Sequence, residues 1–344
     1  MSTKILRSEP LTSNTQLEFL NTIFNSFVID DYTNQTSGLV LIDIEPEISH
    51  TKWVLIKDIA KRASKTNIKI CFAQHYEALG WHANSHTWQK IIDILDSQNF
   101  SLNRVCYISG DLRYSPTNTR FDEIHHIGVN LFEIVTGDRY KNKFTASTTN
   151  KSKQFLCLNY LARTHRRATH YYLKQNNLLD INYCSFQKSE YENVKLPEVI
   201  IPYDKPWPEG IMHQSKKWYD DTVFSFVTET SIDNNVLFLT EKTYKPIMYG
   251  HPFVVLGNPG TLEYLQSKGY QTFPELFDES YDTIQNSAER LNKIIEICNT
   301  VDVQNYTPSV LNKLKHNQEL FFSRKNSLEE LQKLGNFLSQ MAEI

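Results

Sequence analysis

Short apolar runs alternate with segments of helical periodicity along this chain, and this alternation limits the possible fold more than any other feature. In the first 110 residues the apolar runs are GLVLIDI (38–44), NIKICFA (67–73) and NRVCYISG (103–110), separated by helical patterns over 51–63 and 85–98. Strands that alternate with helices are typical of a parallel sheet with crossover connections. The pattern therefore predicts an α/β fold.

A second series of the same kind follows a polar segment. Residues 136–153 (TGDRYKNKFTASTTNKSK) are polar and lack periodicity, so we interpret them as a linker. Beyond it we expect a helix over 164–177, a tail of two helices ending near Met341, and strands at 153–159, 181–186, 222–229 and 252–257. A chain of 344 residues is too long for a typical single core. We therefore expect two α/β domains, 1–150 and 151–344, that face a central cleft, with the helical tail in the second.

Charge and hydropathy exclude some classes of protein. The formal net charge of -3 argues against a generally basic nucleic-acid binder, although a local basic groove would not alter this total. The chain has no apolar run of about 20 residues and no apolar N-terminal segment of signal-peptide length. We expect a cytoplasmic protein without a membrane span. The five cysteines are dispersed, four of them within strand-like runs, which predicts buried free thiols.

Charged residues gather where the strands of the second domain end. Ligands of open α/β sheets bind beyond the carboxyl ends of the strands. The first such junction, LNYLARTHRRATHYYL, places Arg163, Arg166 and Arg167 at the start of a helix. Cations at a helix N-terminus oppose the helix dipole unless they share an anion, and a phosphate would serve. Ordinary arginines on a solvated helix face are the alternative.

A second junction, VTETSIDNNVLFLTEKT, places Glu229 at the end of one strand and Glu241 and Lys242 at the start of the next helix. Carboxylates at such a position can accept hydrogen bonds from ribose hydroxyls, and a lysine can neutralise a diphosphate. Simple helix capping, with Thr240 as N-cap and Glu241 in the first turn, needs no ligand. Capping leaves Lys242 unexplained, so we predict an anionic nucleotide ligand, with Lys245 close to it.

The segment FSFVTETSIDNNVLFLTEKTYKPIMYGHPFVVLG resembles the donor-binding motif of the α-1,3-fucosyltransferase family, in which an acidic EN-S/T turn precedes Y-V-T-E-K and a P-hydrophobic-G strand. The resemblance implies that Glu229, Glu241 and Lys242 match the family's glutamates and lysine, and that Arg166 matches its phosphate-binding arginine. Thr230 stands where the family has Asn. The resemblance also implies a GT-B-like fold of two Rossmann-like domains. The N-terminal domain would bind the acceptor and the C-terminal domain the nucleotide sugar, with GDP-fucose as the leading donor.

A shorter stretch of the first domain, NRVCYISGDLRYSPTNTRFDEIHHIGVN, is similar to the family's R-V-x-Y-x-G-E-N…F-D-Y-A-I-G region, whose glutamate is the general base. Asp111 stands at that position, although Gly-Asp after a strand is also a common turn. Glu77, in FAQHYEALGW, is the second candidate. A carboxylate that deprotonates the acceptor hydroxyl contributes about 10² to 10⁴ in rate. Direct displacement of the diphosphate would invert the anomeric centre.

The leaving diphosphate needs preorganised positive charge, which Arg163, Arg166, Lys242 and Lys245 would supply. We therefore expect a glycosyltransferase that moves a sugar from a nucleoside-diphosphate donor to a hydroxyl of a glycan or other acceptor, with no metal or other cofactor. One alternative is a glycosyltransferase that acts on modified DNA bases, which the overall acidic charge disfavours. The other is a non-catalytic protein that binds sugar nucleotides or glycans.

Overall fold

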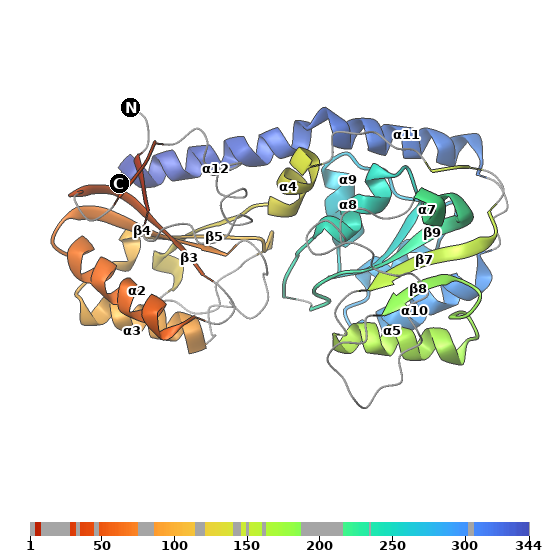
Figure 1. Ribbon diagram of the computed structural model, residues 1–344, viewed down its shortest axis with the longest axis horizontal. Coiled ribbons are helices and arrows are strands. Elements are labelled where there is room, and N and C mark those ends of the chain that lie inside the picture. The colour runs from red at the N-terminus through yellow and green to blue at the C-terminus, as the bar shows by residue number, and fades with distance from the viewer. Residues whose placement is uncertain are drawn as a thin grey trace. The chain divides into compact units, whose positions relative to one another are not determined.

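The chain divides into two units that are described separately below. Unit 1 comprises Met1–Arg139, Asn235–Phe238 and Ser327–Ile344, and unit 2 comprises Tyr140–Asn234 and Leu239–Asn326. The structure is a computed structural model, drawn in Figure 1. It describes residues 4–7, 28–31, 35–44, 48–74, 86–113, 121–139, 146–148, 151–159, 163–186, 216–233, 235–301 and 306–343.

Unit 1 is built on a parallel sheet with the strand order β2-β1-β3-β4-β5-β6. Its strands are β1 (Lys4–Arg7), β2 (Val28–Asp31), β3 (Ser37–Asp43), β4 (Asn67–Gln74), β5 (Val105–Ser109) and β6 (His125–Gly128). Its α-helices are α2 (His50–Ala63), α3 (His86–Ser97), α4 (Leu131–Arg139) and most of α12 (Lys325–Glu343). The three strands predicted for the first domain are β3, β4 and β5.

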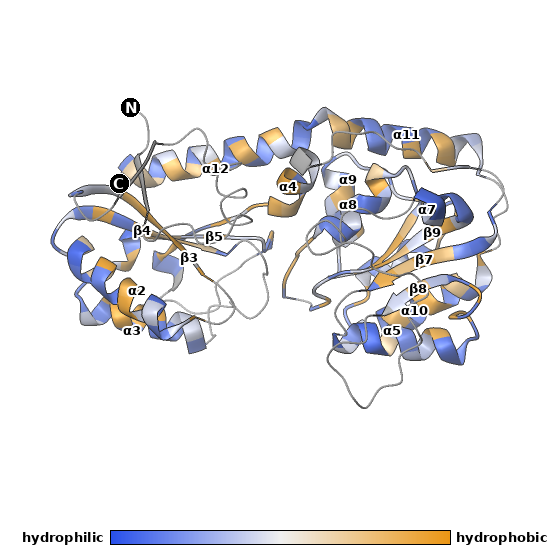
Figure 2. Ribbon diagram, viewed as in Figure 1, coloured by the Kyte–Doolittle hydropathy of each residue, from blue (hydrophilic) through white to orange (hydrophobic). Residues whose placement is uncertain are grey.

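Helices cover both faces of this sheet, as the alternation of side chains along β4 shows. Ile70 and Phe72 pack into a cluster with Trp88 of α3, whereas Cys71 lies in a second cluster with Leu334 of α12. Successive side chains of a strand point to opposite faces, so a run of consecutive apolar residues indicates a sheet buried on both sides. Figure 2 shows the matching apolar colour on the central strands.

Unit 2 contains a smaller parallel sheet with the order β10-β9-β7-β8. Its strands are β7 (Lys153–Asn159), β8 (Tyr183–Phe186), β9 (Thr222–Thr228) and β10 (Phe253–Leu256). Its α-helices are α5 (Thr164–Gln175), α7 (Lys216–Asp221), α8 (Glu241–Met248), α9 (Thr261–Ser267), α10 (Ser287–Thr300) and α11 (Pro308–Ser323). In Figure 1, α5 and α10 lie on one side of this sheet and α7, α8 and α9 on the other.

The structure differs from the sequence-based division in the segment Asn235–Phe238, which belongs to unit 1, and in two helices. Helix α4 continues to Arg139, so the first residues of the predicted linker are helical. The last helix belongs to unit 1 rather than to the second domain, because Leu334, Leu338 and Met341 pack into the core of the first sheet. All five cysteines are free and buried, as predicted. Among the described residues, no helix is both long and apolar enough to cross a membrane.

Candidate active site

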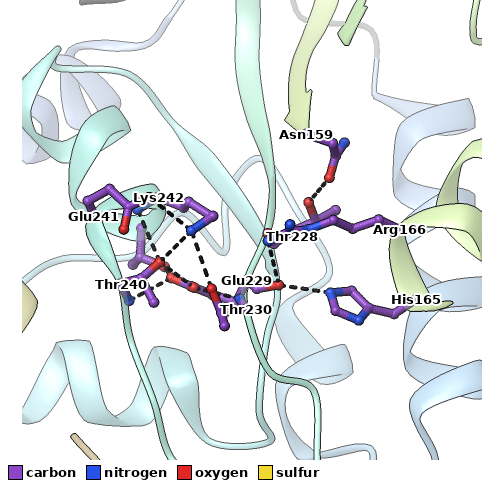
Figure 3. A network of polar contacts seen from close by, with 10 residues as sticks. Asn159, His165, Arg166, Thr228, Glu229, Thr230, Thr240, Glu241 and Lys242 are labelled. Atoms are coloured by element: carbon purple, nitrogen blue, oxygen red, sulfur yellow. Dashed lines mark hydrogen bonds and ion pairs between the residues drawn. The ribbon is translucent and has the colours of Figure 1, made fainter. Parts of the chain in front are cut away.

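The carboxyl ends of the unit 2 strands bring together the residues that the sequence singled out in the second domain. Because all pairings in this sheet are parallel, β7, β9 and β10 end at the same edge. The residues at that edge form what we call the strand-end cluster: Arg163, Arg166, Glu229, Thr240, Glu241, Lys242 and Lys245. Figure 3 shows five of them in one network of polar contacts, together with neighbours that include Asn159 and His165.

The carboxylate of Glu229 is the centre of this network and is fully buried. Its Oε1 accepts from the backbone N–H of Thr240 at 3.0 Å and from the hydroxyl of Thr243 at 2.6 Å. Its Oε2 accepts from the backbone N–H of Thr230 at 3.0 Å and from the hydroxyl of Thr240 at 2.7 Å. These four bonds match the acceptor capacity of a carboxylate. Glu229 therefore ties the end of β9 to the start of α8.

The guanidinium of Arg166 braces the same strand end from α5. It donates to the backbone carbonyls of Thr228 and Glu229, both at 3.2 Å, and the residue is 2% exposed. Nε2–H of His165 donates to the Glu229 carbonyl at 2.8 Å, and burial lowers the pKa of His165 to about 4, so this imidazole is neutral at pH 7. Arg163, at the N-cap of α5, is half-buried. The structure thus directs Arg166 to main-chain oxygens and leaves Arg163 nearer the surface.

The first turn of α8 carries the predicted pair of charges. Thr240 is the N-cap, as the capping pattern indicated, and its hydroxyl accepts from the backbone N–H of Lys242. The ammonium of Lys242 donates to Glu241 at 2.9 Å, to Thr240 Oγ1 at 3.2 Å and to Thr230 Oγ1 at 3.3 Å. Burial would raise the pKa of Glu241, but Lys242 and Lys245 outweigh it and lower that pKa to about 2. The Glu241 carboxylate is therefore ionised at neutral pH.

Lys242 keeps part of its side chain in contact with solvent, with an exposed fraction of 23%, against 11% for Glu241. Lys245 lies one turn further along α8, is 5% exposed, and lines a small cavity together with Lys242. Four cationic side chains of the strand-end cluster thus face two carboxylates. The cluster has an excess of positive charge at a helix N-terminus, which favours an anion.

The neighbouring helix α9 offers no comparable site. Its first backbone amides, those of Leu262 and Glu263, donate to the carboxylate of Asp282 at 3.0 to 3.2 Å. Asp282 belongs to the acidic run FDESYD. Another residue of this run, Asp278, caps the short 3-10 helix Glu279–Thr283 by accepting from the backbone N–H of Ser280. A carboxylate already neutralises the start of α9, so of these two helices only α8 has a first turn with excess positive charge.

In unit 1, Asp111 directly follows β5 and is 4% exposed. Its Oδ1 accepts from the backbone N–H groups of Arg113 and Leu237, each at 3.0 Å. Gly110 packs against the ring of Phe238, and a Cβ at position 110 would lie 2.5 Å from that ring. The turn after β5 therefore holds the segment Asn235–Phe238 in place. Glu77, the other candidate base, lies outside the described residues.

Sequence reasoning missed four residues of this network: Asn159, His165, Thr228 and Thr243. The amide oxygen of Asn159 accepts from the hydroxyl of Thr228, and Thr243 supplies one of the four donors to Glu229. Polar residues that end a parallel strand or lie in the first turn after it are the available signal, and Asn159 and Thr243 both satisfy it. His165 also satisfies it, in the first turn of α5, but it lies among arginines that drew the attention to charge.

Comparison with solved structures places this arrangement in a known fold. The whole chain is similar to the DNA-modifying enzyme β-glucosyltransferase, a structure determined with and without uridine diphosphoglucose. The TM-score is 0.52 at 11% sequence identity, over 98% of this chain and 100% of the other. The fold is GT-B-like, with two Rossmann-like units. No protein-family model matches the sequence, and no curated protein is significantly similar to it. The resemblance to α-1,3-fucosyltransferases is therefore supported at the level of the GT-B fold and no further.

Proposed function

We propose that this protein is a glycosyltransferase that transfers a sugar from a nucleoside-diphosphate donor to an acceptor hydroxyl. The observation that carries the proposal is the excess of cationic side chains at the start of α8, where the Lys242 ammonium remains partly exposed. A diphosphate would supply the missing negative charge and would also accept hydrogen bonds from the helix N-terminus. The GT-B-like fold is consistent with this use of the cluster.

The contacts suggest a division of roles within the strand-end cluster. Lys242, Lys245 and Arg163 would neutralise the diphosphate, and the Glu241 carboxylate would accept from the ribose hydroxyls. Glu229, whose carboxylate bonds to the main chain and to threonine hydroxyls, and Arg166, whose Nη2 donates to the main chain, would position the loop and the helix that carry these contacts. Glu229 and Arg166 would act through other residues. Their substitution should therefore disturb the loop and the helix, whereas substitution of Lys242 should remove a direct contact with the donor.

Asp111 is the proposed general base for the acceptor hydroxyl, with Glu77 as the second candidate. Displacement of the diphosphate by that hydroxyl in a single step would invert the anomeric centre. GDP-fucose is the leading donor from the sequence resemblance, and UDP-glucose is the donor that the structural similarity suggests. The acceptor would be a glycan or another hydroxyl compound.

Calorimetric titration with the UDP, GDP, CDP and TDP sugars tests the proposal. One of them should bind, and Lys242→Ala should weaken it roughly 10- to 100-fold, because a charge-assisted hydrogen bond contributes about 1.5–3 kcal/mol. Lys315→Ala is the matched control, since that lysine side chain on α11 is 72% exposed. Binding of none of these sugars, or equal weakening by both substitutions, would contradict the proposal.

A DNA base is the second candidate acceptor, because the similar solved structure is that of a DNA-modifying enzyme. Duplex DNA that carries hydroxymethylated bases should then accept sugar in the presence of the selected donor. Binding to it should weaken steeply with salt, as phosphate contacts release counterions. Slow hydrolysis of the donor without any acceptor would separate either transferase from a protein that only binds sugar nucleotides.

A further inference from the structure

The ammonium groups of Lys245 and Lys242 differ in whether the protein supplies them with hydrogen-bond acceptors. The residue is 5% exposed, yet within the described part of the chain no oxygen atom accepts a hydrogen bond from its ammonium. Lys242, by contrast, donates to three oxygens. Buried ammonium groups are normally paired, because removing the charge from water is costly. The described protein groups supply no acceptor to this ammonium, and a partner can reach it only from the cavity that Lys245 lines.

The ammonium faces a cavity of about 40 Å³ that lies between α8 and the strands β7 and β9. Lys242 and Lys245 both line it, along with Thr228, Ser225 and apolar side chains such as Leu158. The hydroxyls of Thr228 and Ser225 are already hydrogen-bonded to Asn159 and His251. A single water needs roughly 10–15 Å³ of such space, so the cavity has room for more than one small polar group.

The groups that face Lys245 come from each element packed around it. The carboxylate of Glu229 follows β9, Glu241 and Lys242 lie on α8 itself, and the phenol of Tyr219 reaches the cavity from α7. Helix α11 packs on α8 through uncharged residues, among them Gln318 and Phe321. Burial lowers the pKa of Lys245 to about 8, although Glu241 counteracts it. Near pH 8, about half of the molecules therefore carry a neutral amine at this position.

We propose that Lys245 and Lys242 together hold the diphosphate of the donor, and that binding of the donor draws a proton from solvent onto the amine of Lys245. The inference rests on the function proposed above and names a linked event at the same site. The chemistry is a single proton transfer from water or buffer to Nζ, which converts the amine into the ammonium that the diphosphate requires. A nearby anion favours the charged form of lysine, so the bound state keeps the proton.

Calorimetric titration in pairs of buffers with different ionisation enthalpies measures this proton uptake. The probe is the nucleotide sugar selected by the panel above, because both ends of its diphosphate are esterified and have no proton to exchange near neutral pH. We expect an uptake of about 0.1 proton per site at pH 7 and about 0.5 at pH 8, from the ordinary titration of an amine whose pKa is near 8 in the free protein.

Three variants make the test specific. Lys245→Arg should bind the sugar nucleotide with no proton uptake, since a guanidinium is always charged. Lys245→Met should abolish the proton uptake and weaken binding roughly tenfold or more. This variant keeps the test decisive if arginine does not fit the cavity. Lys315→Met, on the exposed face of α11, should retain the wild-type uptake.

Normal binding without uptake in the wild type, or uptake that persists in Lys245→Met, would overturn the inference while leaving the proposed function intact. Absence of binding at every pH would overturn the proposed function, and the inference with it.

Discussion

Replacement of Glu229 by glutamine would separate two roles for this residue, holding the loop and touching the donor. Glutamine keeps the size of the side chain but exchanges one accepting oxygen for an NH₂ group. In either orientation of the amide, that NH₂ faces a backbone N–H and a threonine hydroxyl that now bond to the carboxylate. A buried N–H without an acceptor costs about 1–3 kcal/mol, and the other bonds lose their charge-assisted character.

We therefore expect the free energy of unfolding of unit 2 to fall by roughly 2–4 kcal/mol. For a unit of about 150–250 residues, 1 kcal/mol corresponds to about 2–4 °C, so the thermal midpoint should drop by about 4–16 °C. Differential scanning calorimetry of the full chain measures this change. Glu241→Gln is the control and should lower the midpoint by less than half as much, because Glu241 bonds to Lys242 at the edge of solvent.

The opposite pattern would refute the reasoning. If Glu229→Gln has the same thermal midpoint as the wild type but a lower affinity for the sugar nucleotide, the carboxylate contacts the donor and does not hold the loop. Affinity measured well below the melting temperature should instead change little once the folded fraction is taken into account.

Two further substitutions test unit 1. Asp111→Asn leaves an oxygen that can still accept from Arg113 and Leu237, so the midpoint should stay within about 2 °C, while turnover should fall about 10²- to 10⁴-fold if the carboxylate is the base. Unchanged turnover would move that role to Glu77, for which Glu77→Gln is the matching variant. Gly110→Ala places a methyl group against the buried ring of Phe238 and should cost about 1–3 kcal/mol in urea unfolding. Adding Phe238→Leu should recover part of that loss, and a lack of recovery would show that the strain lies elsewhere.

The central strands were predictable from the sequence because parallel strands buried on both faces appear as unbroken apolar runs, as in IKICF of β4 and QFLCL of β7. Strands β1 (KILR), β2 (VIDD) and β6 (HHIG) each carry charged residues or histidines within four residues, so they do not appear as unbroken apolar runs, whereas the equally short β10 (FVVL) does. The return of α12 to unit 1 depends on tertiary packing, since an amphipathic helix does not reveal in its own sequence which sheet it covers.

The chemical identity of the strand-end cluster was predictable, whereas the direction of its side chains was not. Arg166 was expected at a phosphate, and it donates to two backbone carbonyls. A signal for this existed in the spacing, because Arg166, Thr169, His170 and Leu173 recur at helical intervals and all four are buried. Arg166 thus lies on the face of α5 that packs on the sheet. The charge of Arg166 favoured a role in ligand binding. The helical spacing of the buried residues would have favoured a position in the core.

Comparison of Glu229 with the two lysines of α8 separates a charge that the fold satisfies from charges whose surroundings are unfavourable. Glu229 is buried with all of its hydrogen bonds made, so nothing further is needed to account for it. Lys242 opposes the dipole of the helix in whose first turn it lies, and Lys245 is buried without a hydrogen-bond acceptor among the described residues. A lysine that opposes the helix dipole and a buried lysine without an acceptor, within one turn, would destabilise a helix that had only a structural role. Such departures concentrate at functional sites, and a single bound anion would satisfy both. Donor binding should therefore stabilise unit 2 more than its contact area alone would suggest, because it also removes a cost that the free protein carries.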